Sequence, residues 1–171
     1  MTLDRGRIDA ILDAAADALE GDWLLVGGAA AATWFLPGRV TEDVALVSLR
    51  GAQDDRLALL TLAERLGLSP EAFNSTADFF VHRIPGWTAE MEPLRLGRGA
   101  RIHRPTVTLF ILLKVGRLSE VDLDDCLALL SFARGTSPTL DRDRVVAALE
   151  ALPPTTDAAL LDRRRALRDA L

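Results

Sequence analysis

The sequence predicts an α+β protein in which strands and helices alternate first and helices alone follow. Short apolar runs bounded by glycine and proline, typical of buried strands, are confined to residues 1–104. From residue 105 onward the apolar spacing is helical throughout. With 49% hydrophobic and 26% charged residues, the composition is that of a globular chain. We therefore expect an α/β core at 1–104 and a C-terminal helical region at 105–171 packed on it.

The elements of the core are assigned from their spacing. Apolar residues recur at helical intervals from Ile8 to Leu19, which predicts a helix that ends near Gly21 and carries Asp9, Asp13 and Asp17 on another face. The further elements expected, in order, are a strand at 23–26, a helix at 29–36, a strand at 44–49, a helix at 54–66 with Gly67 as its C-cap, and strands at 78–84 and 90–96 around the turn Pro85-Gly86-Trp87, with 101–103 extending or following them.

Four helices are expected in the C-terminal region. The first covers 106–115, with Pro105 at or near its first turn. Ser119 is placed to cap the second, with Asp122 at N3 as a shorter version of a capping box, and this helix runs to about Phe132. Helices at 141–149 and 156–170 follow, separated by Pro153-Pro154.

Two blocks of sequence carry a resemblance to a known family. The first reads LVGGAA at 25–30 and RVTEDVA at 39–45, which is a strand, a glycine pair, a short helix and then Arg-x-Thr-x-Asp at the next strand. The second has Lys114, Arg117, Asp122 and Asp125 after a proline. Together they resemble the nucleotidyltransferase superfamily, especially its small bacterial branch related to abortive-infection toxins. The resemblance covers 23–130 and implies a mixed β-sheet flanked by helices.

Nucleotidyl transfer needs divalent metal ions, because charge builds on the phosphoryl oxygens. Members of the superfamily place two carboxylates at i and i+2 of one strand, where both side chains share a face. Here Asp43 fills the first position, as the expected catalytic and metal-binding residue, but the second is Ala45. Glu90 or Glu92 would have to complete a Mg²⁺ site, unless both are solvated strand residues.

Six residues are expected to bind the nucleotide. Glycines after a strand let the backbone approach a phosphate, and the following helix offers free N–H groups. The alternative is that the glycines only allow close helix packing and that the charged residues form structural ion pairs. The six are Gly27, Gly28, Arg39, Thr41, Lys114 and Arg117.

Three functions follow from these observations. The first is a degenerate nucleotidyltransferase-fold protein, catalytically impaired through Ala45, that still binds a nucleoside triphosphate or a macromolecule. The second is an active Mg²⁺-dependent enzyme that moves a nucleoside monophosphate to a protein or RNA hydroxyl. The third, compatible with the first, is an interaction module whose partner is a toxin or antitoxin, or RNA, in phage defence.

Charge, cysteine content and apolar runs limit the expected partners and the cellular compartment. The net charge is −5, which argues against a generic grip on nucleic-acid backbone. The lone Cys126 lies in an apolar helical run, where a thiol behaves as a small hydrophobe. The first ten residues lack the apolar stretch of a signal peptide, and no run is long enough to cross a bilayer. We therefore expect a cytoplasmic protein that does not contact membranes.

Overall fold

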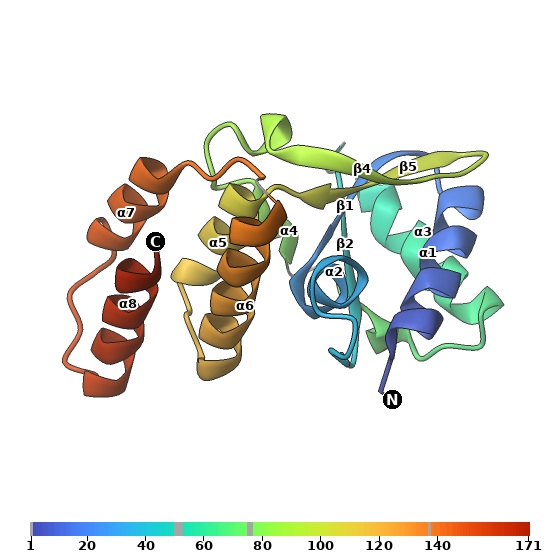
Figure 1. Cartoon of the computed structure of the whole chain (residues 1–171). Helices are drawn as coiled ribbons and strands as arrows, with labels where there is room; N and C mark the ends of the chain where they lie inside the picture. Colours follow the sequence, from blue (N-terminus) through green and yellow to red (C-terminus); the bar gives the residue numbers. More distant parts are fainter. Residues whose placement is uncertain (1, 50–52, 75–76, 137) are drawn as a thin grey trace. The chain divides into compact units, whose positions relative to one another are not determined.

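A computed structural model describes residues 2–49, 53–74, 77–136 and 138–171. The chain divides into two compact units, Met1–Pro105 (unit 1) and Thr106–Leu171 (unit 2). Figure 1 labels most of their elements. In unit 1 these are α1 (Arg5–Ala18), β1 (Gly21–Val26), α2 (Gly27–Trp34), β2 (Val44–Ser48), α3 (Gln53–Arg65), η1 (Pro70–Ala72), β3 (Phe73–Asn74), α4 (Ala77–Val81), η2 (Trp87–Ala89), β4 (Met91–Leu96) and β5 (Ala100–Pro105).

The sheet of unit 1 has the strand order β3-β2-β1-β5-β4, in which β3 contributes only two residues. Strand β1 pairs antiparallel with β2 and parallel with β5. Strands β4 and β5 form an antiparallel hairpin. The sheet is thus mixed, and the predicted α+β class with flanking helices and a helical C-terminal region is confirmed.

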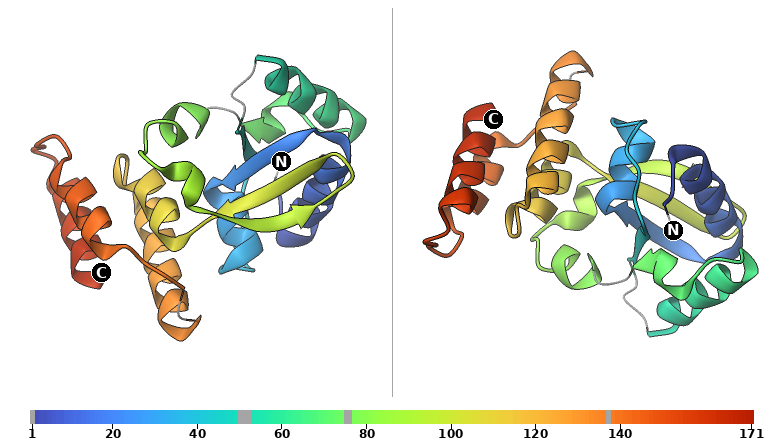
Figure 2. Two further views of the ribbon diagram at one scale, coloured as in Figure 1. Left: turned by 90° about the horizontal axis from the view of Figure 1, so that it is seen from above. Right: turned by 90° about the horizontal axis from the view of Figure 1, so that it is seen from below.

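Helix α1 covers one face of the β4–β5 hairpin. In Figure 2 it lies behind the hairpin in the view from above and in front of it in the view from below. Two glycines of the hairpin turn make this approach possible: a Cβ at Gly97 would stand 2.1 Å from the backbone of Ala16, and one at Gly99 would stand 2.3 Å from the carbonyl oxygen of Leu19. The acidic face predicted for α1 also meets the hairpin, since Arg95 contacts Asp9 and Asp13.

One predicted strand is wrong. Residues 78–84 were expected to be extended because aromatic and β-branched residues favour strands, but 77–81 form the helix α4. Val81 is fully buried and α4 packs on β2, while Phe79 and Phe80 stay more than half exposed. Burial of Val81 against the sheet, with the Asp78–His82 pair one turn apart at 2.9 Å, therefore outweighs strand propensity.

Unit 2 consists of α5 (Val107–Val115), α6 (Glu120–Thr136), α7 (Arg142–Glu150) and α8 (Ala158–Ala170). Helix α5 packs against α6 and α7, and eight of its nine residues are buried, as expected of a core helix. Ser119 and Asp122 form the predicted capping box, in which each side chain accepts a hydrogen bond from the other residue's backbone N–H. No helix among the described residues is long and apolar enough to span a membrane.

Candidate nucleotide-binding turn

The glycine pair forms the junction between β1 and α2. Gly27 has a φ of +72°, which a residue with a side chain rarely adopts, and it begins the helix directly after the strand. The preceding Val26 is extended and offers no side-chain cap to the first N–H groups of α2. These groups are the donors that an anion at a helix N-terminus accepts from.

The Arg-x-Thr segment lies against this junction. A Cβ at Gly28 would be 3.0 Å from Oγ1 and 3.2 Å from Cβ of Thr41, and 3.5 Å from Nη2 of Arg39. Gly28 therefore allows close packing, which is one of the two roles that the sequence predicted for the glycine pair. The same contact places a guanidinium beside the start of α2, where an anion would also gain from the helix dipole.

A residue that the sequence did not single out holds this segment. The backbone N–H of Leu3 donates to the carbonyl oxygen of Thr41 at 2.7 Å, and the N–H of Thr41 donates to the carbonyl oxygen of Leu3 at 3.0 Å. Leu3 is fully buried. Nothing local in the sequence signals this bridge, because its two halves are far apart along the chain.

Asp43 lies next to the turn, and the residue two positions later is the buried Ala45. Oγ1 of Thr41 donates to Oδ1 of Asp43 at 3.3 Å, so Thr41 braces the carboxylate. Ala45 lies opposite Val26 in the sheet and is only 7% exposed. The position two residues after Asp43 is therefore filled by a small side chain within a packed strand.

The structure does not bring Glu90 or Glu92 together with Asp43. Strands β1 and β5 separate β2 from β4, which puts these strands about 14 Å apart. Glu92 is ion-paired with Arg104 on β5. Glu90 was expected to share a strand face with Glu92, but it precedes β4 as the C-cap of η2. The described residues hold no group of three His, Cys, Asp or Glu side chains that could share a metal ion.

Lys114 and Arg117 belong to an ion-pair network within unit 2. Nζ of Lys114 lies 2.8 Å from Oδ1 of Asp122 and 3.0 Å from Oδ2 of Asp125. Arg117 donates to both carboxylate oxygens of Asp122, at 2.7 and 2.9 Å. Burial alone would raise the pKa of Asp122, but hydrogen bonds from Arg117, Lys114 and Ser119 hold it well below its usual range. Lys114 and Arg117 thus form the structural ion pairs that were the alternative to nucleotide binding.

Two further polar clusters lie on the sheet. The guanidinium of Arg104 stacks over the ring of Trp34, 3.9 Å from its centroid, and burial lowers its pKa. Nε2 of His103 lies 2.9 Å from Oδ1 of Asp22, which also pairs with Arg101 at 3.1 Å. The sequence could not signal these contacts, because they depend on which strands are neighbours.

The geometry brings Gly28, Arg39, Thr41 and Asp43 together in unit 1 and places Lys114 and Arg117 in unit 2. Comparisons of the chain with protein-family models, with curated proteins and with solved structures find no match.

Proposed function

We propose that this chain is a nucleotidyltransferase-like protein that binds the phosphates of a nucleotide at the Gly27-Gly28 turn without catalysing metal-dependent transfer. The observation that carries the proposal is the contact between the start of α2 and the Arg39–Thr41 segment, beside a strand in which Ala45 replaces a metal ligand. A helix N-terminus and a guanidinium are both complementary to phosphate oxygens.

The proposed loss of catalysis follows from the carboxylates. A two-metal site needs several oxygen ligands within about 2.0–2.6 Å of each ion. Asp43 supplies one carboxylate, Ala45 none, and Glu92 is paired with Arg104 on the far side of β1 and β5. Without metal ions, Asp43 repels a phosphate instead of binding it through a cation.

Calorimetry with ATP, GTP, CTP and UTP tests the proposal. In EDTA we expect Arg39→Gln to weaken binding of the preferred nucleotide about fivefold or more, since a charge-assisted hydrogen bond is lost. Arg56→Gln, which removes an exposed arginine of α3, is the matched control and should leave the affinity unchanged. Absence of binding by all four nucleotides, with and without Mg²⁺, would refute nucleotide binding.

Asp43→Asn separates a binding protein from an active enzyme. Under the proposal this variant binds nucleotide in EDTA as well as the parent chain or better, because a repelling charge is removed, and neither protein transfers an α-labelled nucleoside monophosphate. An active enzyme would give the opposite pattern: Mg²⁺ would tighten binding and support label transfer, and Asp43→Asn would abolish both effects.

Close packing at Gly28 is tested by a double-mutant cycle. Gly28→Ala introduces a Cβ about 3 Å from Thr41, whose backbone is held by Leu3, so we expect weaker binding and a small loss of stability. In the Thr41→Ala background Oγ1 is absent, and the same substitution should be less harmful. Additive effects in the two backgrounds would show that the contact does not shape the turn.

A further inference from the structure

A hollow of about 340 Å³ lies between the end of α1 and helix α3. Its size is within the range of small-molecule pockets. Leu19 and Leu62, which are 3% and 2% exposed, belong to the buried core beneath it. The full lining is Ala18, Leu19, Leu57, Ala58, Thr61, Leu62 and Arg65.

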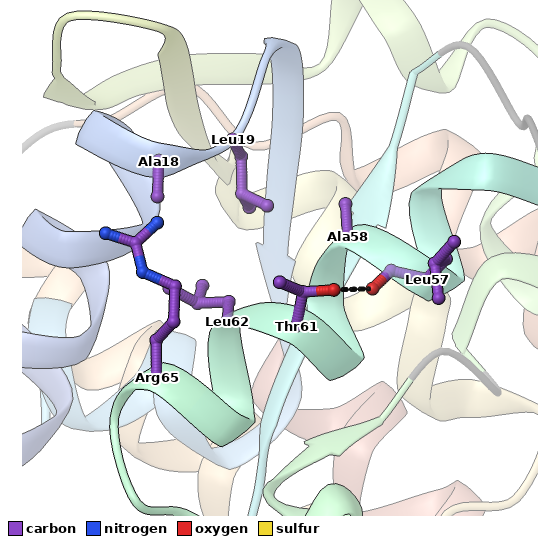
Figure 3. A pocket seen from close by; sticks show the side chains of 7 residues that line it. All are labelled: Ala18, Leu19, Leu57, Ala58, Thr61, Leu62 and Arg65. Carbon is purple, nitrogen blue, oxygen red and sulfur yellow. Dashed lines mark hydrogen bonds between the residues drawn. The ribbon is translucent and has the colours of Figure 1, made fainter.

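The hollow has one cationic end and one apolar end. Figure 3 shows the guanidinium of Arg65 beside Ala18 at one end and the side chain of Leu57 at the other, with Leu62 and Leu19 between them. Leu57 is 66% exposed, which leaves a large apolar side chain in contact with water. Oγ1 of Thr61 already donates to the carbonyl oxygen of Leu57 at 3.0 Å.

Arg65 is the only charged group in this lining, and it makes no hydrogen bond or ion pair within the described residues. Its five N–H donors form a fork that matches a carboxylate. A ligand that fits the hollow therefore carries one anionic group at the Arg65 end and an apolar tail toward Leu57.

We propose that this hollow binds a medium-chain aliphatic carboxylate, with the carboxylate on Arg65 and the tail over Leu62 and Leu19. This site is independent of the proposed nucleotide turn. Leu19 precedes β1 and Gly27 follows it, so the strand, about 20 Å long, separates the two. The two proposals can therefore fail separately.

Titration of the full chain with octanoate, decanoate and dodecanoate, each below its critical micelle concentration, tests the proposal by calorimetry. Each buried methylene contributes about fourfold in affinity. We thus expect the dissociation constant to fall about sixteenfold per step of two carbons until the tail outgrows the hollow. Decanol and decyltrimethylammonium, which share the tail but lack the anion, should bind at least fivefold more weakly than decanoate.

Two variants locate the site. Ala58→Trp fills the hollow from an α3 position and should abolish decanoate binding. Arg65→Gln should weaken it about fivefold, a value reduced by solvent screening of the exposed guanidinium. Arg142→Gln, at an exposed arginine of α7, is the charge-matched control and should have no effect. Equal binding of decanoate and decanol, or unchanged decanoate binding by folded Ala58→Trp, overturns the proposal.

Discussion

The buried cation Lys114 forms ion pairs with two carboxylates of its own unit. Its side chain is 10% exposed, and the two carboxylates that it contacts, Asp122 and Asp125, are 2% and 3% exposed. Removing one partner of a buried ion pair leaves the other charge without compensation, which is strongly destabilising. A phosphate at Lys114 would have to compete with these two carboxylates for its charge.

We expect Lys114→Met to lower the free energy of unfolding by about 3–5 kcal/mol, because the buried Asp125 loses its Lys114 contact and Asp122 keeps only the exposed Arg117 as a cation. Arg117→Gln is the comparison. The side chain of Arg117 is 79% exposed, so its pair with Asp122 should contribute less than the Lys114 contacts, about 1–2 kcal/mol. Urea unfolding measures both values. Similar losses in the two variants would contradict the assignment of Lys114 as the buried centre of the network.

The depressed pKa of Asp122 makes stability depend on pH in the acid range. A carboxyl whose pKa is lower in the folded than in the unfolded state stabilises the fold above the unfolded pKa, about 3.8. This contribution is lost as the pH falls through the folded pKa. Between pH 5 and pH 3 we expect Asp122 alone to account for about 1 kcal/mol of lost stability.

Urea unfolding at pH 5 and pH 3, carried out on the parent chain and on Asp122→Asn, checks this expectation. The variant should be less stable than the parent at pH 5 and should lose less stability on acidification. If acidification destabilises both proteins equally, other carboxyls govern the acid response.

At the scale of elements, the β4–β5 hairpin packs closely on α1 because the hairpin turn carries glycines, which have no side chain to separate the two backbones. A Cβ at Gly97 would lie 2.1 Å from both the carbonyl carbon and the carbonyl oxygen of Ala16, which is much shorter than the non-bonded contacts that Cβ atoms make. The clash would be with backbone atoms near the buried end of α1, and these cannot move away as the end of a flexible side chain can. Arg98 is also anchored there, since its backbone N–H donates to Asp17 at 3.1 Å.

We expect Gly97→Ala to lower the free energy of unfolding by about 3 kcal/mol, because α1 and the hairpin must move apart. Gly38→Ala is the control, since a Cβ there meets nothing within 4 Å, and it should change stability by less than about 0.5 kcal/mol. Thermal or urea unfolding gives both values. A tolerated Gly97→Ala would mean that the hairpin is not packed on α1 as described.

At the scale of the whole molecule, the charge disfavours binding of a nucleic-acid backbone and leaves room for a small phosphate ligand. The net charge is −5, and several arginines of unit 1 are paired with carboxylates, as in the pairs of Arg95 with Asp9 and of Arg104 with Glu92. A nucleic-acid backbone is held mainly by basic groups that release counterions. In the described part of unit 1, the start of α2 and nearby guanidinium groups offer a phosphate local positive potential.

We therefore expect no measurable binding of duplex DNA or RNA of random sequence at 150 mM salt. Fluorescence anisotropy of a labelled duplex checks this, with a strongly basic protein as positive control. Salt-dependent binding in the micromolar range would revive a nucleic-acid function for the chain and weaken the case for a small nucleotide ligand.

Most elements follow from the sequence because they depend on local properties. Apolar periodicity predicted the helices around α1, α3 and α5–α8, and the Ser119–Asp122 box is a local capping device. The strand predicted at 78–84 was wrong because burying Val81 on β2 stabilises the fold more than an extended conformation of its neighbours would. Strand propensity is weak and context-dependent, so the sheet decided this segment.

The glycine turn was visible in the sequence, whereas its surroundings were not. The sequence by itself determined the α+β class, the Gly27-Gly28 junction and the absence of a carboxylate at Ala45, since these depend on residue type and short-range spacing. Only the tertiary structure decided that Leu3 holds Thr41 and that Glu92 pairs with Arg104. Both depend on strand order and on contacts between distant segments, which local spacing does not encode.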